Sequence, residues 1–251
     1  MSPRTARGRV DRLLVERGLV DSRAKAQALI MAGQVYTGTR RIAKPGETVP
    51  LDAPLEVRGR DHPWVSRGGV KLAHALDHFA IDPRGLVCLD IGASTGGFTD
   101  VLLSRGAARV YAVDVGRGQL AWKLRNDERV VVLERTNARH LTAAHVPVAP
   151  DLIVCDASFI GLETVLPAPL ALAAPRARLV ALIKPQFEVG KGRVGKGGVV
   201  RDPALHEEVC GRIRGWLEVR PGWRVLGLTR SPVEGPHGNV EFLIAAAHDG
   251  G

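Results

Sequence analysis

Residues Val87–Leu102 carry the stretch that decides the fold, V-C-L-D-I-G-A-S-T-G-G-F-T-D-V-L. Its first five residues are mostly apolar and predict a buried strand. A glycine-rich turn follows at Gly92–Gly97, and the next residues predict the opening of a helix. Small residues in such a turn let the backbone approach a ligand, and the helix N-terminus offers free N–H groups to it. Asp90 lies near the end of the strand, at the edge where ligands bind in open α/β sheets.

A second acidic residue indicates a nucleotide-like ligand at this turn. Asp114 ends the next apolar run, at a distance from the glycines that suits a carboxylate accepting hydrogen bonds from ribose hydroxyls. The glycines are spaced G-x-x-x-G-G, whereas dinucleotide-dependent dehydrogenases use G-x-G-x-x-G. The observed spacing is more similar to the turn that binds S-adenosylmethionine (SAM) in methyltransferases. A tight packing turn without a ligand is the alternative.

The composition describes an ordinary globular chain of 251 residues, 45% of them hydrophobic, long enough for one large and one small domain. The basic start is followed by no apolar segment of the signal-peptide type, and no run is long and apolar enough to span a bilayer. The three cysteines are far apart and show no metal-binding spacing. We therefore expect a cytoplasmic protein with no metal site and no stable membrane association. The sequence identifies no protein partner.

The formal net charge of +9 indicates a polyanionic partner, and its position along the chain favours nucleic acid. Residues 1–60 hold twelve lysines and arginines and six acidic residues, so they carry +6 (12 − 6) of that charge in under a quarter of the length. A protein that is merely basic throughout is the alternative. The concentration at the start of the chain predicts a small nucleic-acid-binding module there.

The first sixty residues predict two helices followed by short strands. Spaced apolar side chains predict a helix within residues 8–20 that ends at Gly18. Asp21 or Ser22 can cap a second helix, which ends at Gly33. Its predicted apolar stripe is Ala24, Ala28 and Leu29. Short strands are predicted at 34–37, 40–43, 44–47 and 55–57.

A linker and a further helix are predicted next. Pro63 breaks regular structure within residues 61–66, and Trp64 is expected to pack between domains. A helix then runs from Ser66 to about Phe79 with Leu72, Leu76 and Phe79 as its core stripe. Lys71 lies off that stripe, so a surface lysine is one interpretation of it.

Strands and helices alternate from Gly85 onward, which predicts a mostly parallel sheet covered on both faces. The predicted strands are 86–91, 109–114, 130–133, 151–156, 178–184, 223–230 and 239–246. The predicted helices are 97–105, 117–125, 162–173 and 203–218. The last two strands follow each other without a helix, so we expect the final strand to be antiparallel. Seven strands with one reversed is the usual architecture of SAM-dependent methyltransferases.

Two charged residues end apolar strands of this predicted sheet. Asp156 ends one run and Lys184 ends the next, so both are expected at the carboxyl edge beside the glycine turn. A lysine that follows an apolar run needs an acid nearby. Glu241 interrupts the last strand on the face opposite Val240 and Phe242, and needs a cationic partner if that face is covered. An ion-pair network that only ties strands together is the alternative.

The same groups have a chemical use beside a SAM turn. A ribose hydroxyl is a poor nucleophile until its proton is removed. A lysine can take that proton once burial or a neighbouring cation favours its neutral form, while acids hold the lysines in position. The methyl group on a sulfonium is already activated, so alignment of the reacting atoms supplies much of the remainder.

Five local sequences resemble those of the TlyA family of ribosomal-RNA methyltransferases, whose members are also described as haemolysins: V-S-R-G-G-V-K-L, L-D-I-G-A-S-T-G-G-F-T-D, D-A-S-F-I, I-K-P-Q-F-E and G-N-V-E-F. The order Lys71, Asp156, Lys184, Glu241 resembles the Lys-Asp-Lys-Glu tetrad of FtsJ-like ribose 2′-O-methyltransferases. Residues 8–60 resemble the RNA-binding domain first seen in ribosomal protein S-four, through R-V-D-R-L-L-V-E-R-G-L-V-D-S-R-A-K-A-Q-A-L-I-M-A-G-Q-V-Y and K-P-G-E-T-V.

This resemblance implies SAM-dependent 2′-O-methylation of cytidine in ribosomal RNA or ribosomal subunits. By the family pattern Lys184 is the base that takes the proton of the 2′-hydroxyl. Asp156, Glu241 and Lys71 position Lys184 and tune its basicity. The implied cofactor-binding residues are Asp90, Gly92, Ala93, Ser94, Thr95, Gly96, Gly97, Phe98, Asp114, Val115, Asn137 and Ala138. The implied RNA-binding residues are Arg7, Arg23, Lys25, Arg40 and Arg41.

The expected fold is therefore α/β, a Rossmann-like methyltransferase with a seven-stranded, mostly parallel sheet, preceded by a small α+β RNA-binding domain. The expected divisions are 1–60 for the RNA-binding domain, 61–66 for the linker and 67–251 for the FtsJ-like domain. Two other functions stay open at this point, an RNA-binding ribosome-assembly factor with an idle methyltransferase fold and a membrane-active haemolysin. The complete tetrad argues against the first, and the lack of an export signal or long amphipathic helix against the second.

Overall fold

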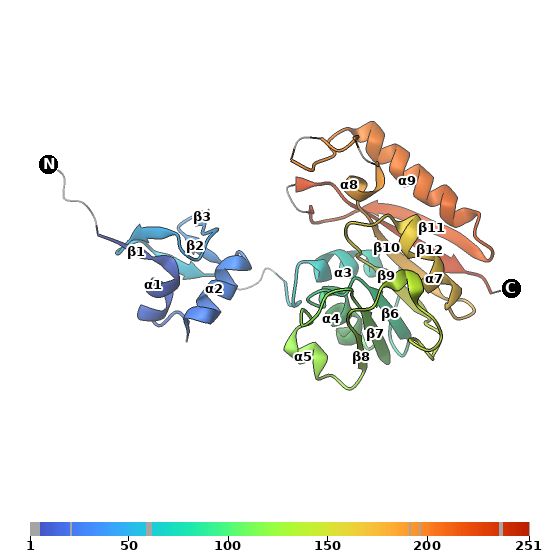
Figure 1. Ribbon diagram of the computed structural model, residues 1–251, viewed down its shortest axis with the longest axis horizontal. Coiled ribbons are helices and arrows are strands. Elements are labelled where there is room, and N and C mark those ends of the chain that lie inside the picture. Colours follow the sequence, from blue (N-terminus) through green and yellow to red (C-terminus); the bar gives the residue numbers. More distant parts are fainter. Residues whose placement is uncertain are drawn as a thin grey trace. The chain divides into compact units, whose positions relative to one another are not determined.

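Figure 1 shows the computed structural model of the chain, which describes residues 6–20, 22–58, 62–190, 192–195, 197–235 and 238–250. The chain forms two compact units, Met1–Pro63 and Trp64–Gly251. Asp61, where the predicted linker begins, and Asp21, one of the two predicted caps, lie outside the described residues. None of the described helices is long and apolar enough to cross a membrane.

The first unit combines two helices with short antiparallel strands. Its elements are β1 (Arg7–Arg9), α1 (Val10–Glu16), α2 (Arg23–Met31), β2 (Val35–Thr37), β3 (Arg40–Arg41), β4 (Thr48–Pro50) and β5 (Leu55–Val57). Strand β1 pairs with β4, and the other three strands form a sheet in the order β3-β2-β5. The predicted strand at 44–47 is wrong, because Pro45 and Gly46 form a turn there and β4 begins after it.

The core of this small unit is built from both helices and the strands. Ser22 caps α2, since its side chain accepts a hydrogen bond from the Lys25 N–H. The predicted apolar stripe of α2 is wrong: Ala26 and Ile30 are buried, whereas Ala24 and Ala28 are exposed and Leu29 is half-buried. Alanines carry little pattern information, and the large Ile30 decides which face turns inward.

The second unit is organised around one twisted seven-stranded sheet with the order β11-β12-β10-β9-β6-β7-β8. Its strands are β6 (Val87–Ile91), β7 (Arg109–Val113), β8 (Val130–Leu133), β9 (Leu152–Cys155), β10 (Arg178–Ile183), β11 (Trp223–Arg230) and β12 (Phe242–His248). Strands β6 to β10 pair in parallel, and β12 runs antiparallel to both β10 and β11. The predicted sheet with a reversed final strand is confirmed.

Helices cover both faces of this sheet (Figure 1). They are α3 (Gly68–His78), α4 (Gly97–Ser104), α5 (Trp122–Arg125), the 3-10 turn η1 (Ala138–His140), α6 (Leu162–Val165), α7 (Pro167–Ala171), α8 (Pro185–Glu188) and α9 (Pro203–Glu218). Residues of α3, α4 and α5 share one apolar core with the sheet, and residues of α6, α7 and α9 share the other. The carboxyl edge of the parallel strands therefore lies between two helical layers.

Three predicted elements differ from the observed ones. The helix expected at 117–125 is reduced to α5, because Gly118 has a φ of 68° in the preceding loop. The helix expected at 162–173 is divided into α6 and α7, because Pro167 has no N–H to continue the ladder. The last strand begins at Phe242, so Glu241 immediately precedes β12 instead of interrupting it.

A buried carboxylate fastens the first unit together. The Asp11 side chain is fully buried in α1 and accepts hydrogen bonds from Arg9, from Arg23 of α2 and from Gln27 of α2. These hydrogen bonds, with that of Arg9 the largest cause, hold the pKa of Asp11 well below its ordinary value of 3.8, although burial opposes the shift. Asp11 therefore joins β1, α1 and α2 through one charge.

Replacing Asp11 with alanine should destabilise the first unit by about 2 kcal/mol, because two arginines lose their shared carboxylate. The lowered pKa means that this contribution is present above pH 3.8 and is lost as the pH falls below it. Hydrogen exchange of the amides in residues 6–58, compared between the Asp11→Ala and the unchanged protein at pH 7, measures this loss of stability. Amides of residues 64–235 should keep their protection.

The matched control is Asp52→Ala, which removes an exposed acid from the same unit. It should change the free energy of unfolding by less than about 0.5 kcal/mol. Equal exchange rates in the Asp11→Ala and Asp52→Ala proteins would show that Asp11 does not join the three elements.

Candidate active site

A cleft of about 290 Å³ lies at the carboxyl edge of the sheet in the second unit. Strands β6, β9 and β10 all end beside it, and the N-termini of α3 and α4 open onto it. Its walls are formed by Ser66, Arg67, Gly68, Lys71, Gly92, Ala93, Ser94, Thr95, Gly97, Phe98, Asp156, Ser158, Lys184, Val233, Glu234 and Gly235. Parallel strands bring their ends together at such an edge, so residues far apart in the sequence converge there.

The glycine-rich turn forms the floor of this cleft because it packs with almost no side-chain volume. A Cβ atom on Gly97 would overlap Ser66 Oγ and lie 2.9 Å from the Gly69 nitrogen. A Cβ atom on Gly92 would lie 3.0 Å from the Ala157 backbone. Gly96 has a φ of 94°, which favours glycine. The turn therefore lies directly against the segments that follow β9 and precede α3.

Asp114 fixes the shape of the same turn from the neighbouring strand. Its carboxylate accepts hydrogen bonds from the Ser94 N–H at 2.8 Å and from the Gly116 N–H at 2.7 Å. Ser94 has a φ of 49°, and its hydroxyl donates to Gln119 at 3.2 Å. A carboxylate that holds two backbone N–H groups keeps the turn closed around the place where a nucleoside would bind.

Not all residues predicted for the cofactor line the cleft. Gly92, Ala93, Ser94, Thr95, Gly97 and Phe98 do so, whereas Asp90, Gly96, Asp114, Val115, Asn137 and Ala138 are outside its walls. Val115 is 70% exposed, and Asn137 caps η1 by accepting a hydrogen bond from the Arg139 N–H. Asp114, Val115 and Asn137 follow β7 and β8, so they are at the same carboxyl edge as the cleft.

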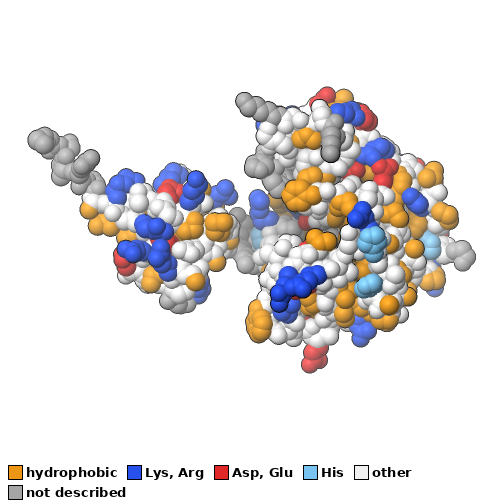
Figure 2. Space-filling model, viewed as in Figure 1, with side chains coloured by type: hydrophobic (Ala, Val, Ile, Leu, Met, Phe, Trp, Pro, Cys, Tyr) orange, Lys and Arg blue, Asp and Glu red, His pale blue; other side chains and the backbone are white. Residues whose placement is uncertain are grey.

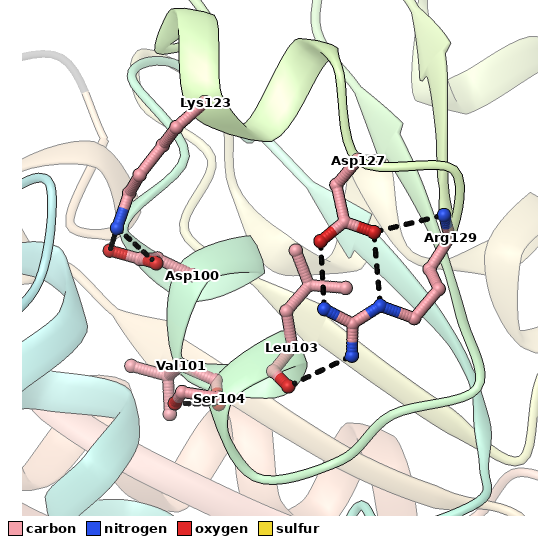
Figure 3. A network of polar contacts seen from close by, with 7 residues as sticks. All are labelled: Asp100, Val101, Leu103, Ser104, Lys123, Asp127 and Arg129. Atoms are coloured by element: carbon pink, nitrogen blue, oxygen red, sulfur yellow. Dashed lines mark hydrogen bonds and ion pairs between the residues drawn. The ribbon is translucent and has the colours of Figure 1, made fainter.

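Helix α4 is anchored at its start by Asp100, as Figure 3 shows. Lys123 of α5 donates to both carboxylate oxygens of Asp100, at 2.8 and 3.0 Å. The same carboxylate accepts the Val65 N–H at 2.8 Å. Further along, Arg129 bridges the Leu103 carbonyl and Asp127. The contacts of Asp100 hold the first turn of α4, which faces the cleft, and that of Arg129 holds its last turn.

Two ion pairs bring the four predicted catalytic residues together. Lys71 Nζ of α3 lies 2.5 Å from Glu241 Oε2, and Lys184 Nζ at the end of β10 lies 2.7 Å from Asp156 Oδ1. Lys71 is 8%, Lys184 7% and Glu241 1% exposed. The interpretation of Lys71 as a surface lysine is wrong, because Glu241 draws it inward. Gln186 Nε2 also donates to Glu241, at 3.4 Å.

Lys184 has further acceptors besides Asp156 Oδ1. Its Nζ donates to Ser158 Oγ at 2.8 Å and to the Asp156 carbonyl at 3.3 Å. Asp156 Oδ1 is close enough for an ion pair but is not aligned for a hydrogen bond. The amine is thus held at the mouth of the cleft by three oxygen atoms, all from the segment that follows β9.

Two aromatic rings lie near Lys184, outside the residues that form the walls of the cleft. Phe159 is 89% exposed, has a φ of 64°, and its ring lies 5.0 Å from that of Phe187 in α8. A non-glycine residue in the left-handed region is strained and persists where its surroundings hold it. A large exposed ring beside a polar cleft offers a stacking face to a nucleobase.

Asp90 is buried beneath the glycine turn. Its Oδ2 accepts a hydrogen bond from the Thr99 hydroxyl at 2.6 Å, and its Oδ1 has no partner among the described residues. Burial is the largest of the causes that together raise the pKa of Asp90 to about 7, since the nearby carboxylates of Asp156 and Asp114 add to it and the hydrogen bond from Thr99 opposes it. The carboxyl group therefore changes its charge near neutral pH.

Basic side chains gather on the visible face of the first unit (Figure 2). Of the five residues predicted to bind RNA, Arg23 pairs with Asp11 and Arg40 with Glu47. Arg7 donates to the Thr48 carbonyl, Arg41 lies against Gly33, and Lys25 is exposed on α2. All five belong to the first unit, and two of them, Arg23 and Arg40, share their charge with a neighbouring acid.

The sequence reasoning missed seven residues of the cleft. These are Ser66, Arg67, Gly68, Ser158, Val233, Glu234 and Gly235. Ser158 lies two residues after Asp156, just beyond the end of β9, a position that could have revealed it. Gly235 packs against Glu241 so closely that a Cβ atom would overlap the carboxylate, a contact between segments that the sequence does not indicate.

Comparison with known proteins identifies the family of the chain. Residues 64–248 match the model of the FtsJ-like methyltransferases, and residues 8–53 match that of the S4 domain. The chain belongs to the FtsJ-like methyltransferase family. Both the predicted resemblance and the predicted enzyme class are confirmed.

Relatives cover nearly the whole chain. The 16S/23S rRNA (cytidine-2'-O)-methyltransferase TlyA of Mycobacterium tuberculosis is 54% identical over 95% of this chain and 89% of its own length. Hemolysin A of Brachyspira hyodysenteriae is 39% identical over 94% of this chain and 98% of its own length. The solved structure of a candidate hemolysin from Streptococcus thermophilus has 40% identity and a TM-score of 0.75, covering 98% of this chain and 90% of that one.

The family uses SAM, and the residues of the cleft fit it. The small residues of the turn at Gly92–Gly97 let a ligand approach its backbone, and the N-terminus of α4 is directed at the cleft. The Asp156 carboxylate in its wall suits a cationic sulfonium. The predicted cofactor is therefore confirmed, while the individual contacts to it stay a proposal.

Asp90→Asn should change how stability depends on pH. Because the folded pKa of Asp90 lies near 7 and its ordinary value is 3.8, the folded state binds the proton more tightly, and stability falls as the pH rises through this window. The variant loses this dependence. Between pH 5 and pH 8 the free energy of unfolding of the Asp90→Asn protein should rise by more than about 1 kcal/mol relative to that of the unchanged protein.

Thermal unfolding at both pH values measures this difference, with the exposed Asp82→Asn as the matched control. Parallel curves for the Asp90→Asn protein and the control would contradict a buried carboxyl group that titrates near neutral pH.

Proposed function

We propose that the protein transfers the methyl group of SAM to the 2′-oxygen of a cytidine ribose in ribosomal RNA. The observation that carries this proposal is the nearly buried Lys184 amine, which is held by Asp156 and Ser158 in the wall of the cleft that the glycine turn floors. A base in that place suits a hydroxyl nucleophile, which must lose a proton as it reacts. The name of the Mycobacterium tuberculosis relative supports the same substrate and position.

In this proposal each of the four charged residues has a separate role. Lys184 accepts the proton of the 2′-hydroxyl, and Asp156 holds the amine in position and stabilises the ammonium that results. Lys71 and Glu241 form the second ion pair, so their charges largely cancel, and Gln186 helps to orient Glu241. Lys71 lines the cleft, and its amine can donate a hydrogen bond to the oxygen as it becomes nucleophilic.

The cofactor supplies a methyl group already activated by its positive sulfur. The residues that would hold it are Asp90, Gly92, Ala93, Ser94, Thr95, Gly96, Gly97, Phe98, Asp114, Val115, Asn137 and Ala138. The backbone of the turn binds its polar parts, and Asp114 accepts hydrogen bonds from the ribose hydroxyls at its remaining acceptor sites. Their role is to align the reacting atoms, which accounts for much of the rate in such a transfer.

The first unit is proposed to hold the RNA. Its basic residues face phosphates, which give affinity without sequence specificity. The choice of the methylated nucleotide must therefore come from RNA shape and from the cleft. The exposed ring of Phe159 suits a base that has been turned out of its stack. A ribosomal substrate implies work in the cytoplasm, where ribosomes are assembled.

Replacing Lys184 with methionine keeps the length of the side chain and removes the amine. We expect single-turnover methyl transfer to ribosomal RNA to fall by about 10³-fold, because general base catalysis is lost. Affinities for SAM, measured by calorimetry, and for RNA, measured by filter binding, should stay within about threefold, since neither depends on proton transfer.

Arg84→Met serves as the control, because Arg84 is an exposed basic residue of the second unit outside the walls of the cleft. It should leave the transfer rate within about twofold of the unchanged protein. A normal rate in the Lys184→Met protein would remove the proposed base, whatever the substrate.

The double change Arg7→Gln and Arg41→Gln tests the RNA surface. If each arginine faces one phosphate, the slope of log affinity against log salt should become shallower by about 1.4 to 1.8. The control is the double change Arg84→Gln and Arg224→Gln. Both arginines are exposed and lie at the sheet edge opposite the cleft, Arg84 before β6 and Arg224 at the start of β11. Equal slopes in the two double variants would contradict RNA binding by the first unit.

A further inference from the structure

The hydrogen bonds around Lys184 depend on its protonation state. In the structure its Nζ faces Asp156 Oδ1 at 2.7 Å, Ser158 Oγ at 2.8 Å and the Asp156 carbonyl at 3.3 Å. An ammonium has three protons to direct at oxygen atoms and accepts nothing. The two aligned acceptors, with the Asp156 carboxylate beside them, suit the ammonium form that Lys184 takes once it has accepted a proton.

A neutral amine in the same place needs a donor, because it has two protons and one lone pair. A carbonyl oxygen and an ionised carboxylate cannot donate, so neither atom of Asp156 can serve the lone pair. The Ser158 hydroxyl can, since a hydroxyl both donates and accepts. Of the three oxygen atoms around Nζ, that of Ser158 is thus the one able to exchange roles with it.

The Ser158 hydroxyl is also open to the cleft. Ser158 lines the cleft and is exposed, and among the described residues its hydroxyl makes no hydrogen bond besides the one from Lys184. A hydroxyl accepts two hydrogen bonds, so one acceptor position remains for a group in the cleft. A substrate hydroxyl that enters there can donate a hydrogen bond to Ser158 Oγ.

The backbone holds this serine in place. Phe159, the next residue, has a φ of 64°, and its ring lies 5.0 Å from that of Phe187, which follows Lys184 by three residues. On the other side a Cβ atom at Gly92 would lie 3.0 Å from the Ala157 backbone. A strained turn held from both sides is the kind of geometry found where a side chain must be precisely directed.

We propose that Ser158 is a catalytic residue that relays the proton from the 2′-hydroxyl to Lys184, which rests on the function proposed above. As the 2′-oxygen forms its bond to the methyl carbon, the electrons of the carbon–sulfur bond stay with sulfur. The 2′-hydroxyl proton passes to Ser158 Oγ, and the Ser158 proton passes to the lone pair of Lys184 Nζ. Lys184 ends as an ammonium beside the Asp156 carboxylate.

Three variants of the full chain test the relay. Ser158→Ala removes the hydroxyl, Ser158→Thr keeps it, and Ser104→Ala is the control, an exposed serine of α4. Single-turnover methyl transfer should fall by on the order of 10²-fold in Ser158→Ala, and return to within about tenfold of the unchanged protein in Ser158→Thr. The Ser104→Ala protein should be unaffected. SAM affinity, measured by calorimetry without RNA, should not change in any of them.

Mixtures of light and heavy water give a readout that a structural role would not move. Two protons in flight should curve the plot of rate against deuterium fraction in the unchanged protein. One proton should make the plot linear in Ser158→Ala. A transfer rate in Ser158→Ala within threefold of normal, or the same curvature in both proteins, overturns the relay. A loss of SAM affinity equal to the loss of rate overturns it too, because Ser158 would then serve cofactor binding.

The Lys184→Met protein separates this inference from the function on which it rests. If that variant is inactive and Ser158→Ala is normal, Lys184 acts on the substrate directly and the relay alone fails. If Lys184→Met itself retains the normal rate, the proposed base fails, and with it the acceptor of the relayed proton.

Discussion

The pairing of two nearly buried lysines with two carboxylates is the constraint on which the site depends. An ammonium taken out of water is costly unless an acid and further oxygen atoms receive it, and removing one partner of such a pair costs about 3–5 kcal/mol. Lys71 and Glu241 are separated by 170 positions in the sequence. Their ion pair therefore connects α3 to the segment before β12. Lys184 and Asp156 tie the ends of β10 and β9 in the same way.

The parallel sheet makes this pairing possible. Parallel strands deliver their last residues to one edge, and the right-handed crossovers between them leave that edge open to solvent between two helical layers. Glycines at Gly92 and Gly97 then let the segments after β9 and before α3 approach the turn to contact distance. The cleft is therefore a consequence of strand direction and small side chains, and its walls come from five separate parts of the second unit.

Much of this could be predicted from the sequence, because it depends on local patterns. Apolar runs give the seven strands to within a few residues, and a charged residue at the end of such a run marks the edge of the sheet, as with Asp156 and Lys184. What could not be predicted depends on contacts between distant segments. Helical periodicity put Lys71 off the core stripe, and only the buried Glu241 explains why it turns inward. The stripe of α2 was missed because alanines fit either face.

The direct test of the account is the chemical position of the transferred methyl group. Undermethylated small and large ribosomal subunits are incubated separately with the full chain and radiolabelled SAM, and the RNA is then hydrolysed in alkali. The account predicts label in an alkali-resistant dinucleotide, with the methyl group on the ribose 2′-oxygen of a cytidine. Label on a base, or no label in a protein that binds SAM, would contradict it.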